Sequence, residues 1–300
     1  MYNGAINVYK EAGFTSFDVV AKLRGILRQK KIGHTGTLDP NAEGVLLVCL
    51  GNATKLVEQL VDKVKVYECV MRLGVETDTE DMSGEVLKTS AVDCTSDDIR
   101  SAAMSFVGGY DQLPPMYSAL KVNGRKLCDI ARAGGTAQRT PRHVDIHSIE
   151  IKDIDGDRVT MSIECGKGTY IRSLCRDIGE KLGCGAAMEH LIRTRSGDFY
   201  IDKAYKLSEI EVAAKNGSVG DLILPTETFF MDIPAFRVKP EKAAAIDNGN
   251  MLPAAAFDDA EKISTKDGER IRVINDRGNF VAVYAYKSNR GAFVPEKMFL

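Results

Sequence analysis

Residues 31 to 55 read K-I-G-H-T-G-T-L-D-P-N-A-E-G-V-L-L-V-C-L-G-N-A-T-K. A glycine-rich turn with one Asp-Pro pair stands directly before a continuous apolar run, which predicts a buried strand over 45 to 50. Gly36 and Gly44 permit backbone conformations or close approaches that a Cβ would block, and the proline after Asp39 disfavours a helical conformation there. The pattern predicts a turn that displays the Asp39 carboxylate. An ordinary Asp-Pro turn with a purely structural aspartate is the alternative.

Size and composition limit the class of protein. Three hundred residues with 44% apolar content are enough for one large domain and a small one, or for two medium ones. No apolar run could span a bilayer, and residues 1 to 10 lack the regions of a signal peptide, so we expect a cytoplasmic protein with no membrane contact. The seven cysteines form no C-x-x-C pair, and His143 and His147 lack other ligands nearby, so no disulfide framework and no metal site are expected.

The net charge of −2 hides charges that are segregated along the chain. Three basic runs stand near glycine-rich or turn segments, and an acidic run lies between the first and second. The basic runs are Lys22, Arg24, Arg28, Lys30 and Lys31; Lys121, Arg125, Lys126, Arg132, Arg139 and Arg142; and Lys167, Arg172, Arg176, Arg193 and Arg195. The acidic run is Glu76, Asp78, Glu80, Asp81 and Glu85. Each basic run alone suits a solvated helix face, but together they favour a phosphate-rich ligand.

Hydrophobic periodicity predicts mixed α and β content. The predicted strands are 5–9, 45–50, 65–73, 142–154 and 158–165, and the predicted helices begin at a Ser16 cap, at Thr54, after Ser96 and near Thr169, the last ending near Gly183. Asn123-Gly124 predicts a tight hairpin with Lys121, Arg125 and Lys126 around its tip, suited to gripping a phosphate backbone. Beyond about Phe229, three prolines, a short helix over 241–247 and strands over 270–274 and 280–286 indicate a small β-rich domain.

A second segment with candidate functional residues is G-K-G-T-Y-I-R-S-L-C-R-D-I-G, residues 166 to 179. Glycines ahead of a helix place Tyr170 and Arg172 in its first turn, at a strand-to-helix corner where side chains can face a cleft. A basic residue in a first turn opposes the helix dipole, a cost that a carboxylate partner would offset. The alternative is a half-buried core tyrosine beside a surface arginine.

Five segments together resemble the bacterial TruB-type tRNA pseudouridine synthases, in the order found in that family. They are G-H-T-G-T-L-D-P-N-A-E-G-V-L, L-G-V-E-T-D-T-E-D, P-P-M-Y-S-A-L-K-V-N-G-R-K-L, G-K-G-T-Y-I-R-S-L and H-L-I-R-T-R-S-G, and the resemblance spans at least residues 6 to 197. It implies an α+β fold: a mixed, mainly antiparallel central sheet with flanking helices over 1–229, an RNA-gripping thumb segment around 111–142, and a PUA-like domain over 230–300.

The resemblance implies isomerisation of uridine 55 in the T loop of tRNA to pseudouridine. Asp39 would be the nucleophile, Arg172 its charge partner, and Tyr170 the base that removes the proton from C5. Tyr67 would stack on the flipped base, Leu191 would wall the pocket and His34 would hold the base out of the loop. Lys10 joins the substrate-binding set, although the family's Lys-Pro pair reads Lys10-Glu11 here. Lys121, Arg125, Lys126 and Arg142 would contact the RNA backbone.

Physical reasoning supports this assignment. A desolvated carboxylate tends to take up a proton, so an arginine partner keeps it charged, and a bidentate guanidinium also fixes its direction. The isomerisation moves no hydride, phosphoryl or acyl group, so no cofactor is required. Attack by Asp39 on the sugar C1′ and addition to uracil C6 both remain open. We expect a monomer, because no self-complementary stripe stands out.

Two other functions remain open at this stage. The first is RNA binding or tRNA-folding chaperone activity on the same scaffold, either alone or in addition to catalysis. The second is a small-molecule glycoside enzyme, which would ordinarily need a second carboxylate, such as Asp78 or Asp81.

Overall fold

The structure is a computed structural model that describes residues 1–300. Its largest element is an eight-stranded sheet in which every neighbouring pair is antiparallel except β3 with β13. The strand order is β1 (Gly4–Lys10), β3 (Glu43–Leu50), β13 (Ala186–Ser196), β4 (Lys65–Leu73), β12 (Arg158–Cys165) and β11 (Ile146–Asp155), with β2 (Ile32–His34) on β3 and β14 (Phe199–Tyr200) on β13. The expected mixed, mainly antiparallel sheet is confirmed.

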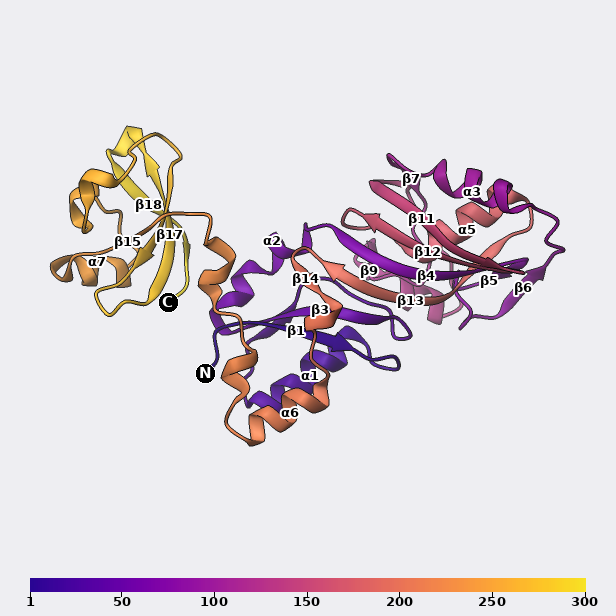
Figure 1. The fold of residues 1–300 in the computed structure, drawn as a ribbon, viewed down its shortest axis with the longest axis horizontal. Coiled ribbons are helices and arrows are strands. Elements are labelled where there is room, and N and C mark those ends of the chain that lie inside the picture. Colours follow the sequence, from indigo (N-terminus) through magenta and orange to yellow (C-terminus); the bar gives the residue numbers. More distant parts are fainter.

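Helices cover the two ends of this sheet (Figure 1). α1 (Ser16–Leu27) and α6 (Leu207–Lys215) share a core with β1 and β3, whereas α3 (Ser96–Met104) and α5 (Ile171–Leu182) share another with β4, β11, β12 and β13. α2 (Val57–Val61) and α4 (Leu127–Arg132) are single turns outside these layers. No helix has both the length and the apolar character needed to cross a membrane.

The start of α1 differs by one residue from the expected cap. Thr15, not Ser16, is the N-cap, because the Thr15 side chain accepts from the Asp18 backbone and the Asp18 carboxylate accepts from the Thr15 backbone. Ser16 is the first helical residue and is buried. Its hydroxyl is therefore free for a different partner, in the Asp39 turn.

The predicted strand over 142–154 is two strands. β10 (Arg142–Val144) pairs with β7 (Tyr110–Gln112), which the sequence did not reveal, and only β11 joins the main sheet against β12. The Asn123-Gly124 hairpin is confirmed between β8 (Lys121–Val122) and β9 (Arg125–Lys126), with φ of 50° and 81° at its two central residues. β5 (Val75–Thr77) and β6 (Val86–Thr89) form a further ribbon.

The C-terminal part forms a separate four-stranded sheet, drawn in orange and yellow in Figure 1. Its strands are β15 (Ala235–Arg237), β16 (Arg270–Ile274), β17 (Phe280–Lys287) and β18 (Ala292–Met298), with α7 (Ala243–Asp247) alongside. This sheet has its own core, built around Phe257, Tyr284 and Phe293. Phe230, Phe280 and Phe299 stack between it and the face of β3, so the two parts meet through an aromatic contact.

The parallel junction of β3 and β13 lies in the middle of the main sheet. Tyr67 on β4 pairs with Arg193 on β13, which in turn pairs with Gly44 on β3. Gly44 has a φ of +101°, and a Cβ there would lie 2.2 Å from the Arg193 carbonyl oxygen, so only glycine fits. The Asp39 turn directly precedes β3. The Gly44–Arg193–Tyr67 pairing therefore places that turn beside the middle of β13 and the start of β4.

Candidate active site

Buried side chains from separate elements hold the backbone around Asp39. The Lys10 ammonium, at the end of β1, donates to the carbonyl oxygens of Pro40 at 3.0 Å and Ala42 at 2.5 Å. The Ser16 hydroxyl accepts from the Leu38 amide at 2.9 Å and lies 3.2 Å from the Leu38 carbonyl oxygen. The main chain on both sides of Asp39 is therefore fixed before any ligand arrives.

Lys10 thus has a different role from the predicted one. It is fully buried, and its ammonium also contacts the Glu11 carbonyl oxygen, so its three protons point at main-chain oxygens. Burial lowers the pKa of Lys10 to about 8, while the nearby Asp39 carboxylate acts in the opposite direction. Lys10 supports the Asp39 turn and has no donor left for a substrate.

Arg193 fixes the same turn from β13, and the sequence did not single it out. It is only 2% exposed and has no carboxylate within ion-pair distance. Its Nε donates to the Val45 carbonyl oxygen at 2.7 Å, and its Nη2 donates to that of Gly36 at 3.1 Å. From the sequence, Arg193 belongs to a basic run that suits a solvated face. In the structure it pairs with Gly44 and is a buried side chain that supports the backbone of the Asp39 turn.

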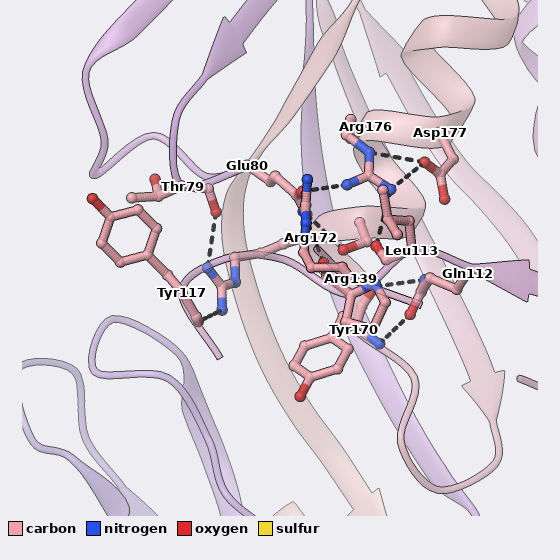
Figure 2. Close-up of polar contacts among 12 residues, drawn as sticks. Thr79, Glu80, Gln112, Leu113, Tyr117, Arg139, Tyr170, Arg172, Arg176 and Asp177 are labelled. Carbon is pink, nitrogen blue, oxygen red and sulfur yellow. Dashed lines mark hydrogen bonds and ion pairs between the residues drawn. The ribbon is translucent and has the colours of Figure 1, made fainter. Parts of the chain in front are cut away.

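Arg172 provides the charge partner of Asp39. Its side chain is 5% exposed, and its Nε lies 2.9 Å from Asp39 Oδ2. The other two nitrogens donate elsewhere, Nη1 to the Thr79 carbonyl oxygen at 2.8 Å and Nη2 to that of Tyr117 at 3.0 Å. The ion pair therefore uses one nitrogen instead of the expected bidentate fork, and the direction of the guanidinium is set by two backbone oxygens (Figure 2).

The neighbours of Asp39 act in opposite directions on its pKa. Burial raises the pKa of its carboxyl group, Arg172 lowers it, and the Asp81 carboxylate raises it again. Asp81 itself lies 3.5 Å from Arg172 Nη1, so the two carboxylates share one guanidinium. The Asp39 side chain remains 37% exposed, so it is accessible from one side. A charged but poorly solvated carboxylate with one open side suits nucleophilic attack.

Tyr170 precedes α5 as its N-cap residue, one position outside the first turn expected from the sequence. Its ring is half-buried, and burial, followed by the neighbouring Asp39 charge, raises the pKa of its hydroxyl, while Arg172 opposes this. The hydroxyl is consequently protonated at neutral pH. The helix ends at Gly183 in a left-handed conformation, as predicted.

The predicted base-binding residues gather around the same point. Tyr67 on β4 and Leu191 on β13 are 8% and 6% exposed and belong to one apolar cluster, which also contains Leu38. His34 ends β2, and its Nδ1 accepts from the Gly36 amide at 3.4 Å. Burial and the Arg193 charge lower the pKa of His34, so the imidazole is neutral at neutral pH. The walls of the site are therefore aromatic or aliphatic, with one neutral imidazole at the rim.

Of the predicted RNA-backbone residues, Arg142 lies beside this corner, because it pairs with Gln112 on β7 and its charge acts on the Tyr170 hydroxyl, whereas the other three lie on the β8–β9 hairpin. Lys121, Arg125 and Lys126 are exposed on the β8–β9 hairpin, and Arg142 is exposed at the start of β10. None of the four takes part in an ion pair, whereas Arg172 and Arg176 in the third basic run do. The acidic run also contains a buried, paired member: Glu80 is buried and contacts Arg176 and Ser173.

Two other features define the surroundings of the site. A cavity of about 1120 Å³ lies between β3, the 196–205 segment and residues 221–233, and Asp39 does not line it. No group of three or more His, Cys, Asp or Glu side chains is placed to hold a metal ion.

Comparisons with known proteins match both the sequence and the fold. The family model described as "TruB family pseudouridylate synthase (N terminal domain)" matches residues 24–171, and "tRNA pseudouridylate synthase B C-terminal domain" matches residues 172–231. The chain is 50% identical over 307 residues to tRNA pseudouridine synthase B of Lachnoclostridium phytofermentans, covering 99% of this chain and 100% of the relative. It is 40% identical over 310 residues to the protein of that name from Bacillus subtilis, covering 100% and 98%.

Solved structures show the same fold. A chain of an H/ACA RNP bound to a substrate RNA containing 2′-deoxyuridine superposes with a TM-score of 0.68 at 27% identity, over 99% of this chain and 85% of the other. A chain of a Cbf5-Nop10-Gar1 complex superposes with a TM-score of 0.69 at 29% identity, over the same shares. These matches extend over the C-terminal sheet as well as the main one.

Proposed function

The chain belongs to the TruB family of pseudouridylate synthases, and on that premise we propose that it isomerises uridine 55 in the T loop of tRNA to pseudouridine. The observation that carries the proposal is the Asp39 carboxylate held 2.9 Å from a buried Arg172, next to the apolar cluster that contains Leu38, Tyr67 and Leu191. Full-length relatives named tRNA pseudouridine synthase B support tRNA as the substrate.

The reaction exchanges one glycosidic bond for another. The bond from uracil N1 to C1′ breaks, a bond from C5 to C1′ forms, and the proton on C5 is lost while N1 gains one. Asp39 supplies the electron pair that carries the intermediate, either at C1′ or at C6. Arg172 keeps Asp39 ionised in a site where burial favours the neutral acid.

The base must leave the stack of the T loop to reach Asp39. Flipping costs roughly a few kcal/mol, which stacking and backbone contacts offset. Tyr67 provides the stacking face, Leu191 on the neighbouring strand extends the same apolar surface, and the neutral His34 holds the flipped conformation. Burial keeps the Tyr170 hydroxyl protonated, so in this proposal the phenol first gives its proton to N1 of the uracil ring, and the phenolate that forms then takes the proton from C5.

RNA affinity comes from the exposed basic side chains. Lys121, Arg125 and Lys126 lie at the tip of a hairpin in the 111–142 thumb segment, and Arg142 lies at its base. Their charges are free of protein partners, so each can contact a phosphate of the T arm. The catalytic part comprises residues 1–229 and the PUA-like part residues 230–300, and we place the enzyme in the cytoplasm as a monomer.

The direct test is to incubate the protein with an unmodified tRNA transcript and map pseudouridine by nucleotide position. We expect conversion at position 55 and none in a transcript with cytidine there. Release of tritium from 5-tritiated uridine gives the rate independently. Tight tRNA binding or refolding without nucleotide conversion would indicate a chaperone alone, and conversion at another position would contradict the assigned substrate.

A further inference from the structure

The backbone of Tyr170 is held in both directions by one buried amide side chain (Figure 2). The Tyr170 N–H donates to Gln112 Oε1 at 2.8 Å, and Gln112 Nε2 donates to the Tyr170 carbonyl oxygen at 3.0 Å. Gln112 is 1% exposed and lies on β7, far from α5 in the sequence. Tyr170 is the N-cap residue of α5 and makes no capping hydrogen bond with its side chain; Gln112 accepts from the N–H of Tyr170 itself, one of the amides that a helix start leaves without an intrahelical partner.

The direction of the Gln112 amide is determined by its other neighbours. The Tyr110 hydroxyl donates to Asp177 Oδ2 at 2.9 Å, so its oxygen is left to accept from Gln112 Nε2 at 2.6 Å. This arrangement turns Gln112 Oε1 toward the Tyr170 N–H. Asp177 is paired in turn with Arg176, whose guanidinium also binds the buried Glu80. The amide thus ends a polar chain in which each donor has an acceptor.

The same stretch of chain also fixes Arg172. Its Nη2 donates to the Tyr117 carbonyl oxygen at 3.0 Å, five residues beyond Gln112. The stretch 110–117 therefore holds both Tyr170 and Arg172 against the Asp39 turn. Because it opens the segment that bears the basic hairpin, the position of that segment and the alignment of the site are linked.

We propose that Gln112 is a positioning residue for the reaction: its clamp on the Tyr170 backbone sets where the phenol lies relative to the flipped uridine. The inference rests on the proposed function, since it assigns Gln112 a role in placing the group that takes the C5 proton. Displacement of a reacting group by about 1 Å can slow a reaction by about 10²-fold. A glutamine that only completed the helix end would affect stability and leave chemistry unchanged.

The chain contains a matched control for this clamp. Gln29 holds the backbone of Tyr2 in the same way, with Tyr2 N–H donating to Gln29 Oε1 at 2.7 Å and Gln29 Nε2 donating to the Tyr2 carbonyl oxygen at 2.9 Å. Gln29 is 6% exposed and follows α1, outside the site described above. Replacing either glutamine by methionine removes one clamp of the same chemistry and retains the side-chain volume.

The experiment compares Gln112→Met with Gln29→Met and the unsubstituted protein. We expect Gln112→Met to slow single-turnover pseudouridine formation about 10- to 100-fold, with the tRNA dissociation constant unchanged within about threefold. The kinetic isotope effect with 5-deuterated uridine should increase, because removal of the C5 proton becomes slower. Gln29→Met should match the unsubstituted protein in all three measurements.

Three outcomes would overturn the inference: equal rates for the two variants, a loss confined to tRNA affinity, or an unchanged isotope effect. If Gln112→Met does not fold, Tyr110→Phe removes the hydroxyl that orients the amide and should give the same signature at a smaller magnitude; an unchanged rate there would also overturn it. Failure of the unsubstituted protein to form any pseudouridine would instead refute the proposed function.

Discussion

The Asp39 corner and the β8–β9 hairpin both carry charges to which we assign a function, but they hold these charges in opposite ways. Arg172 in the corner is 5% exposed and contacts two carboxylates and two backbone oxygens. Lys121, Arg125 and Lys126 on the hairpin are exposed and have no ion-pair partner. The difference fits the proposed roles, because catalysis benefits from charges whose direction is fixed in advance, whereas phosphate contacts need charges that no protein group already pairs.

Asp39→Asn should give the largest effect that tests this difference between the corner and the hairpin. The amide keeps the shape of the corner but cannot supply a nucleophilic electron pair, so we expect turnover to fall by roughly 10³-fold or more. The tRNA dissociation constant should stay within about threefold, because the hairpin is untouched. Tritium release and filter binding measure the two quantities. Substantial turnover by this variant would remove Asp39 from the mechanism.

Arg172→Gln is the next largest change. Burial raises the pKa of Asp39 and Arg172 opposes that rise, so loss of the guanidinium raises the pKa further. Since the reaction needs the carboxylate, the acidic limb of the pH–rate profile should move to higher pH, and the rate at neutral pH should drop by about 10²-fold.

Arg158→Gln is the control for that change. Arg158 is a surface residue whose Nε lies 3.0 Å from Glu189 Oε1, so its loss should leave the profile unchanged. An acidic limb that Arg172→Gln fails to move would show that Arg172 does not control the charge of Asp39.

Simultaneous replacement of Lys121, Arg125 and Lys126 by alanine tests the other side of the comparison. Binding should weaken, and the slope of log affinity against log salt should become shallower by roughly two, since about 0.7 counterions are released per phosphate contact in single-stranded RNA. The rate from the bound complex should not change. Lys88, Lys152 and Lys215 are exposed on other elements, so their triple alanine variant matches the charge change. Equal slopes for the two triple variants would exclude the hairpin as a phosphate contact.

Ser16→Ala tests whether the support of the turn matters for the rate. The Leu38 amide would lose its buried acceptor, and the free energy of unfolding should fall by about 1–3 kcal/mol. Because the same hydrogen bond holds the backbone next to Asp39, turnover should fall several-fold below the unsubstituted protein. Urea unfolding and single-turnover rates measure the two effects. A loss of stability with full activity would show that the Ser16–Leu38 hydrogen bond stabilises the fold but does not affect the rate.

Tyr67→Phe should have the smallest effect. The ring stays in place for stacking, and the lost hydroxyl has a pKa that burial raises, so it is neutral at neutral pH. We expect turnover within about threefold, while Tyr67→Leu should lose the stacking contribution of roughly 1–3 kcal/mol per base. A strongly impaired phenylalanine variant would give the hydroxyl a direct chemical role.

Local signals in the sequence determined a large part of this protein. Strands over 5–9, 45–50 and 65–73 are present, the Asn123-Gly124 hairpin forms as predicted, and Gly183 ends α5. These features follow from periodicity and from turn residues that need a positive φ, both of which act between near neighbours. The Asp-Pro turn before β3 belongs to the same group, and the five family segments added its pairing with Arg172.

Only the tertiary structure decided which charges are buried and what they hold. Arg193 and Lys121 both stand in basic runs of the sequence. Arg193 is nevertheless buried and donates to backbone oxygens around the Asp39 turn, whereas Lys121 is exposed. Lys10 faces inward for the same reason, because the register of β1 against β3 places it beside the turn's carbonyl oxygens. The Gln112 clamp joins β7 to α5 across the fold. Such contacts depend on strand register and packing between distant segments, which no local pattern encodes.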